Sequence, residues 1–173
     1  HNNYQILVVD DFSEDNGLSY VEDWLDGKQK IKRKSIFNQN IEKPNNIDFI
    51  KISENKIFKK NIFFKQKVIL VNSKKNRGFA GANNLGIKYV LNVNDFDYIW
   101  LLNNDTVIEK NSLVELLSKF KKNRKMGICG SKILYYHEPF VVQTLGGMYY
   151  NKWLGQMKEV GNGLSIDENI KES

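Results

Sequence analysis

The stretch QILVVDDFSED, residues 5–15, decides the fold class of this chain. It contains most of an apolar run, Tyr4 to Val9, that lacks the regular alternation of a half-exposed strand. Such a run is typical of a central strand in a parallel sheet, because both faces of that strand are covered. The run ends in two acids, Asp10 and Asp11. The stretch therefore predicts a buried strand with carboxylates at its carboxyl end.

Helix and strand patterns alternate along the rest of the chain. A helix is predicted within residues 13–26 and is expected to end at Gly27. Its apolar face consists of Leu18, Val21, Trp24 and Leu25. Further strands are expected at residues 67–71, 97–102 and 126–136. This order predicts an α/β protein with a mainly parallel sheet flanked by helices.

Two more helices and a hairpin complete the expected elements. Gly78 and Gly81 open one helix, and the other begins near Ser112, which has capping-box spacing to Glu115. The second helix carries apolar residues at positions i, i+3, i+4 and i+7, namely Leu113, Leu116, Leu117 and Phe120. The segment GGMYYNKWLGQ, residues 146–156, predicts an antiparallel hairpin near the C-terminus. We expect a single domain over residues 1–173.

Positive charge is concentrated in one segment. Residues 28–67 hold 12 Lys or Arg and three acids, a net charge of +9, whereas the whole chain carries +6. Residues 28–66 lack clean periodicity and are interpreted as a basic insertion, in which DFIKIS, residues 48–53, could form a strand. The charge could meet an anionic membrane surface, a phosphate-bearing substrate or nucleic acid. A solvated loop face is an equally good interpretation.

Cysteine content and hydropathy restrict the class of protein. Cys129 is the single cysteine, so no disulfide can form within the chain, and its apolar surroundings predict a buried thiol. No stretch approaches 18 apolar residues, so we expect no transmembrane helix. The apolar content of 41% is that of a globular protein.

Three polar clusters follow the predicted strands: Asp10, Asn72 to Gly78, and Asn103 to Asp105. Ligands of parallel sheets bind beyond the carboxyl ends of the strands, so the clusters are expected to converge. Asp105 could supply the single carboxylate that a metal on a diphosphate needs, or a residue of an ordinary turn. The glycines of NRGFAGANN, residues 76–84, could admit a phosphate at a helix N-terminus, or a close helix-sheet contact.

Four segments in this order carry a family resemblance: ILVVDDFSED, NRGFAGANNLGI, DYIWLLNNDTVI and MGICGSKILYY. Together they resemble family 2 glycosyltransferases of the GT-A fold, and more narrowly the rhamnosyltransferase-like branch. The resemblance covers roughly residues 4–26 and 67–163. The alternative, a receiver domain of a response regulator, is disfavoured because the strand that ends in VNSKKN lacks the phosphoacceptor acid.

The resemblance implies roles for individual residues. Asp10 matches the acid that contacts the nucleobase of the sugar donor, and Ser13 belongs to the same loop. The other residues implied for the nucleotide sugar are Asn76, Gly78, Asn83, Asn84 and Asn103. Asp105 matches the metal ligand of the D-x-D position, whose first acid is replaced here by Asn103. The implied cofactor is Mg²⁺ or Mn²⁺.

The resemblance also implies an activity and partners. We expect an inverting transfer of a sugar from a UDP- or dTDP-linked donor to a saccharide or lipid-linked acceptor in bacterial surface polysaccharide synthesis. The expected location is the cytoplasm, including peripheral contact with the inner face of the cell membrane. We expect no nucleic-acid partner. The alternative is a non-catalytic module that binds nucleic acid or an anionic surface through residues 28–67.

The catalytic base of the family is expected beyond Ser173, and its first strand and helix before Tyr4. The chain is therefore interpreted as a fragment truncated at both ends, which holds most of the donor-binding half.

Overall fold

The computed structural model describes residues 3–29, 47–60 and 62–168. The chain divides into two compact units, residues 1–105 and 106–173, which are described separately here. No helix among the described residues has the length and apolar character needed to cross a bilayer.

The first unit is built on a parallel sheet of three strands: β1 (Ile6–Asp10), β2 (Phe49–Ser53) and β3 (Val68–Asn72). The strand order is β1-β3-β2, and both pairings are parallel. β3 lies in the centre, and its residues Val68 to Val71 are fully or almost fully buried. The parallel sheet and the strand assignments at its centre and at residues 6–10 are confirmed.

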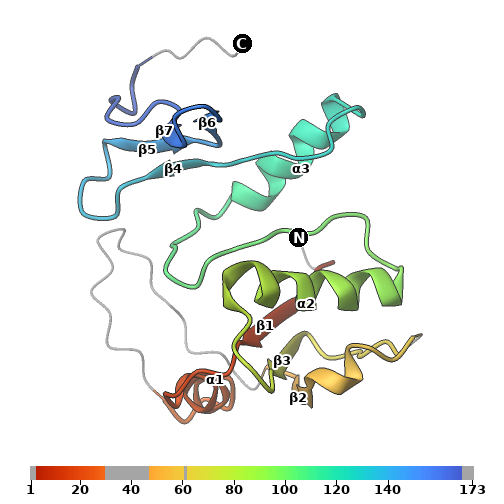
Figure 1. The fold of residues 1–173 in the computed structure, drawn as a ribbon. Helices are drawn as coiled ribbons and strands as arrows, with labels where there is room; N and C mark the ends of the chain where they lie inside the picture. Colours follow the sequence, from red (N-terminus) through yellow and green to blue (C-terminus); the bar gives the residue numbers. More distant parts are fainter. Residues whose placement is uncertain (1–2, 30–46, 61, 169–173) are drawn as a thin grey trace. The chain divides into compact units, whose positions relative to one another are not determined.

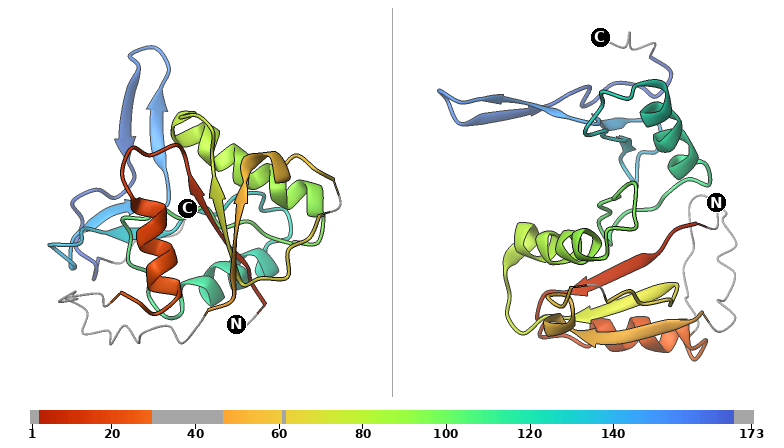
Figure 2. Two further views of the ribbon diagram at one scale, coloured as in Figure 1. Left: turned by 90° about the horizontal axis from the view of Figure 1, so that it is seen from below. Right: turned by 90° about the vertical axis from the view of Figure 1, so that its right-hand side faces the viewer.

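Two helices cover opposite faces of this sheet (Figures 1 and 2): α1 (Gly17–Leu25) and α2 (Gly78–Val93). Alternate residues of β3 point to the two faces, as strand geometry requires. Val68 and Leu70 pack with Leu18 and Leu25 of α1. On the other face, Ile69 and Val71 pack with Leu85 and Tyr89 of α2. The apolar face predicted for the first helix is therefore confirmed, and Gly27, at φ 72°, follows its end.

The basic segment contributes to this core. Its stretch DFIKIS contains β2, which pairs with β3 along all five residues. A short 3-10 helix, η1 (Glu54–Lys56), follows immediately, and Ile57 beyond it is completely buried. Part of the predicted insertion is thus an integral strand. Residues 30–46 and 61 of the same segment lie outside the described residues.

The predicted strand at residues 97–102 is wrong. These residues form no regular structure, and Tyr98, Ile99, Leu101 and Leu102 are 46–54% exposed. An apolar run becomes a strand only where a neighbouring strand satisfies its backbone N–H and C=O groups. Within the described residues no strand pairs with this run.

The second unit contains α3 (Ser112–Lys122) and four short strands: β4 (Lys132–Leu134), β5 (Val142–Leu145), β6 (Met148–Asn151) and β7 (Gln156–Glu159). β6 and β7 pair antiparallel, so the predicted hairpin is confirmed. The helix is also confirmed. Ser112 lies inside it rather than at the cap, however, and no side-chain capping bond forms.

Two predictions for residues 126–136 need correction. Only Lys132–Leu134 is a strand, and it pairs antiparallel with β5 instead of extending the parallel sheet. Cys129 is partly exposed, next to Ile128, which is 91% exposed. The apolar sequence suggested a core position for Cys129. The sequence does not show, however, whether strands cover this residue.

Candidate functional site

Three polar residues are aligned at the carboxyl edge of the sheet. In the strand register Asp10 lies opposite Asn72, and Ser53 lies opposite Asn72 from the other side. This edge is where ligands of open parallel sheets bind. Asp10 and Asn72 were predicted to lie here, whereas Ser53 was not.

The loop after β1 has a defined conformation. The Ser13 N–H donates to Asp10 Oδ1 at 3.3 Å, so the two residues predicted to share this loop do contact each other. Between them Phe12 has φ 62°, in the left-handed region that a bulky residue rarely adopts, and its ring is about half exposed. The loop therefore holds an aromatic side chain at the surface beside the strand end.

A carboxylate connects this loop to the start of α2. The Arg77 N–H donates to Asp11 Oδ2 at 2.6 Å. The other oxygen, Asp11 Oδ1, is buried and makes no hydrogen bond to the described part of the chain. Asp11 thus joins the end of β1 to the turn before α2, although the two are far apart in sequence.

The turn at Asn76 to Gly78 depends on glycine. Gly78 has φ 69°, and its N–H donates to Asn76 Oδ1 at 2.9 Å. A Cβ on Gly78 would meet no atom within 4 Å, so its requirement is one of backbone conformation, and the space beside it is open. At Gly81, by contrast, a Cβ would collide with the Arg77 side chain. Open space and close packing therefore both occur within this glycine-rich segment.

An ion pair between Glu54 and Arg77 supports the same turn. Glu54, which is 6% exposed, accepts hydrogen bonds from the Ser73 hydroxyl at 3.1 Å and from the Lys74 N–H at 3.2 Å. Its Oε2 atom also lies 2.8 Å from Arg77 Nη2. Arg77 donates in turn to the Lys75 carbonyl at 3.1 Å. One carboxylate at the end of β2 therefore holds residues 73–77 in place.

The environment of Glu54 favours its charged form. Burial by itself raises the pKa of the carboxyl. The hydrogen bonds from Lys74 and Ser73 and the charge of Arg77 outweigh burial, so that the pKa lies below the ordinary value of 4.5. Sequence reasoning missed Glu54 because its partners lie about 20 residues away and no local pattern marks it.

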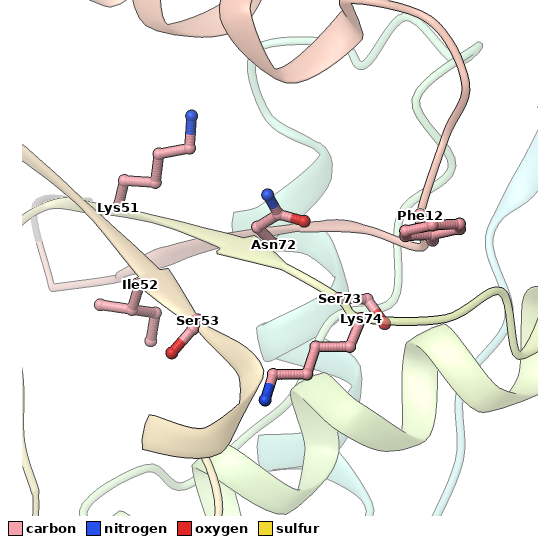
Figure 3. Close-up of a pocket in the computed structure, with 7 residues that line it drawn as sticks. All are labelled: Phe12, Lys51, Ile52, Ser53, Asn72, Ser73 and Lys74. Atoms are coloured by element: carbon pink, nitrogen blue, oxygen red, sulfur yellow. The ribbon is translucent and has the colours of Figure 1, made fainter.

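A shallow pocket of about 480 Å³ lies at this edge (Figure 3). The residues that line it include Phe12, Ser53, Asn72 and Lys74. Lys51 also lines it, and its Nζ atom pairs with Glu22 Oε1 at 2.8 Å. The lining therefore combines aromatic and aliphatic surface, from Phe12 and Ile52, with amide, hydroxyl and lysine side chains.

The remaining predicted site residues lie further along the first unit. Asn83 Nδ2 donates to the Phe79 carbonyl within α2 at 2.9 Å, and Asn84 is exposed on the same helix. Asn103 and Asp105 are exposed residues of an irregular segment. In the part of the chain that the structure describes they follow an irregular segment and not a strand, in contrast to Asp10, and their roles stay predictions.

An α/β unit with polar groups gathered at the carboxyl edge of a parallel sheet is an architecture in which ligands bind at that edge. Residues 53–165 match the family described as Glycosyl transferase family 2, and the chain belongs to this family. The family has the GT-A fold and acts on nucleotide-sugar donors and an acceptor. No curated protein and no solved structure matches the chain.

The family match covers only some of the predicted site. It includes the predicted residues Asn76, Gly78, Asn83, Asn84, Asn103 and Asp105, and also Ser53 and Glu54, which were not predicted, but begins after Asp10 and Ser13. The two latter residues are therefore placed by the strand register and the hydrogen bond described above.

Family 2 enzymes often depend on a divalent metal, which oxygen ligands would hold. Within residues 3–29, 47–60 and 62–168, no three His, Cys, Asp or Glu side chains come together as a metal site. Asp105 offers one exposed carboxylate. This set fits Mg²⁺ or Mn²⁺ when the oxygens of a diphosphate and water complete the coordination shell, and does not fit a metal held by protein alone.

Proposed function

We propose that the chain binds a UDP- or dTDP-linked sugar at the carboxyl edge of the β1-β3-β2 sheet, as the donor site of a rhamnosyltransferase-like glycosyltransferase. The observation that carries this proposal is the alignment of Asp10, Asn72 and Ser53 beside the Asn76 to Gly78 turn. The loop and the turn are joined by the Asp11 to Arg77 hydrogen bond, so they form one site.

Asp10 and Phe12 are suited to the base. A carboxylate has about four acceptor positions, so Asp10 can hold the Ser13 N–H and also accept the ring N–H of uracil or thymine. The exposed Phe12 ring offers a stacking surface of the kind that binds bases without regard to sequence. Ser13 acts by fixing the Asp10 carboxylate.

The turn before α2 is suited to the diphosphate. Gly78 begins a helix of 16 residues, whose N-terminal N–H groups and dipole favour an anion. The open space at Gly78 lets a phosphate approach the backbone, and Lys74, a cationic residue, lines the neighbouring pocket. Asn76 shapes the turn, while Asn83 and Asn84 are proposed to face the ligand from the first turns of α2.

Asp105 is proposed to hold Mg²⁺ or Mn²⁺, with Asn103 on the ribose side. When bound, the metal neutralises the charge that grows on the leaving diphosphate. An acid near the acceptor hydroxyl takes its proton as the new bond forms, and a single displacement inverts the anomeric centre. We propose a saccharide or lipid-linked acceptor in bacterial surface polysaccharide synthesis, at the cytoplasmic side of the membrane.

Calorimetric titration with UDP, dTDP and GDP, each with and without Mn²⁺, tests this function. One pyrimidine diphosphate should bind better than GDP, and Asp10→Asn should weaken it roughly tenfold, about 1.4 kcal/mol. Glu14→Gln, which alters an exposed acid in the same loop, is the control and should bind as the parent does. Equal binding by Asp10→Asn, or no binding of any nucleotide, would contradict the proposal.

The alternative module that binds nucleic acid through residues 28–67 is less favoured by the described contacts. Two of its lysines are used within the first unit. Lys51 pairs with Glu22, and the Lys67 ammonium group donates to the Tyr4 carbonyl and lies 3.4 Å from the centre of the Tyr4 ring. Both contacts favour a structural use of positive charge in this part of the segment.

A further inference from the structure

The β6-β7 hairpin exposes an unusual amount of apolar surface. Its large apolar side chains are 55–86% exposed and comprise Met148, Tyr149, Tyr150, Trp153, Leu154 and Met157. The hairpin projects from the second unit as a two-stranded ribbon (Figure 2). Exposed apolar side chains gathered on one element mark an interaction surface more often than scattered single residues do.

The hairpin has an apolar face and a fixed tip. Tyr150 pairs with Met157 in the register, and Met148 lies two residues before Tyr150, so the three side chains share one face. At the tip Asn151 Oδ1 accepts the N–H groups of Trp153 at 3.0 Å and Leu154 at 3.2 Å. This bonding holds Trp153, which is 86% exposed, in a defined position at the end of the ribbon.

The hairpin carries two lysines and one acid, Glu159, which is the last residue of β7. Residues 146–158 include Lys152 and Lys158 and no acid. The Lys152 ammonium group lies 5.2 Å from the Trp153 ring centre, so a cation accompanies the apolar tip. Glu159, at the base of the hairpin, accepts a hydrogen bond from Asn162 Nδ2 at 2.7 Å. The nearest acid is therefore tied to the base and away from the tip.

We propose that the β6-β7 hairpin inserts its Trp153-Leu154 tip into the interface of an anionic lipid bilayer. Trp and Tyr rings favour the headgroup region, where their apolar bodies leave water and their polar edges stay wet. Lysines beside them meet lipid phosphates.

This surface is distinct from the basic segment and does not depend on which nucleotide the first unit binds. The test is flotation of the full chain with vesicles of phosphatidylcholine alone and of phosphatidylcholine with phosphatidylglycerol in equal parts. The tip variant carries Trp153→Ser and Leu154→Ser. A matched control removes two exposed apolar side chains elsewhere in the second unit, with Val114→Ser and Ile128→Ser. A third variant carries Lys32→Gln, Arg33→Gln and Lys34→Gln in the basic segment.

The parent and the matched control should float with the anionic vesicles, and the tip variant should bind at least about tenfold more weakly. Tryptophan emission should shift to the blue on binding, and a Trp153→Phe variant should lack most of that shift. Equal binding by the tip variant, or loss confined to the basic-segment variant, would overturn the proposal. So would self-association that the tip substitutions abolish, because the hairpin would then bind a second copy of the chain.

Discussion

Val68 to Asn72 and Asp97 to Leu102 are two apolar runs of similar length, yet only the first is a strand. Val68 to Val71 lie between two parallel neighbours, with α1 and α2 on either face, and are buried. Leu101 and Leu102, in the second run, are 54% and 50% exposed. The difference shows that an apolar sequence favours a strand, but that the strand forms only where a partner strand pairs with it.

The proposed donor site shows the same contrast between residues at the ends of paired strands and residues of an irregular segment. Asp10, Asn72 and Ser53 take their positions from paired strands, and the turn at residues 76–78 is held by Asp11 and by the Glu54 ion pair. Asn103 and Asp105 are exposed and follow residues 97–102, which form no regular structure. The residues proposed to contact the nucleotide are therefore held by paired strands, a hydrogen bond and an ion pair, whereas those proposed for the metal and the ribose lie in an irregular segment.

The largest predicted effect is a difference in the loss of stability when a leucine is shortened in each of the two runs. Leu70→Ala removes a completely buried side chain and should lower the free energy of unfolding by about 3 kcal/mol. Leu101→Ala makes the same chemical change in the exposed run and should cost less than about 1 kcal/mol. Urea denaturation of both variants measures the difference. Equal losses would mean that residues 97–102 are packed as tightly as β3.

The next effect concerns the ion pair that supports the turn. Glu54→Ala leaves the partly buried Arg77 without its carboxylate, and should cost about 2 kcal/mol of unfolding free energy. Glu22→Ala breaks the more exposed pair with Lys51 and should cost less than about 1 kcal/mol. If Glu54 also positions the turn, Glu54→Gln should weaken nucleotide binding while Glu22→Gln does not. If the Glu54→Ala variant is as stable as the Glu22→Ala variant, the Glu54 to Arg77 pair does not stabilise the fold more than the exposed pair does.

A smaller effect is expected at the metal position. Asp105 is exposed, so Asp105→Ala should leave the unfolding free energy unchanged. It should abolish the gain in nucleotide affinity that Mn²⁺ provides, which we expect to be roughly tenfold because one carboxylate joins the diphosphate oxygens. Asp97→Ala, an exposed acid on the same segment, is the control. If Mn²⁺ still raises the nucleotide affinity of Asp105→Ala, the metal is held by other residues and the proposal for Asp105 is wrong.

The smallest effect is a pH dependence. The pKa of Glu54 lies below its ordinary value of 4.5, so the unfolded chain binds more protons at this group than the folded one. Its contribution to stability is complete above pH 4.5 and is lost as the pH falls through the lower folded value. Stability of the parent should therefore fall more steeply below pH 4.5 than that of Glu54→Gln. Parallel pH profiles for the two proteins would show that this carboxylate is not stabilised by folding.

The sequence predicted those features that local patterns encode. The continuous run before Asp10, the helical spacing from Leu18 to Leu25 and the glycine at residue 78 each led to the observed element. Long-range partners could not be deduced in this way. The sequence around Glu54 does not indicate that Arg77 is its partner. Likewise, the sequence DYIWLL does not show whether a neighbouring strand is present. Pairing of Lys132–Leu134 with β5 was missed for the same reason.

The central claim is that the donor nucleotide binds at the carboxyl edge of the β1-β3-β2 sheet. Backbone amide NMR shifts of the labelled chain, titrated with UDP or dTDP in the presence of Mg²⁺, test it most directly. The account predicts that the largest shifts occur at Ser13 and at Asn76 to Gly78, with little change along α3. Shifts confined to the basic segment at residues 28–67 or to the second unit would contradict it.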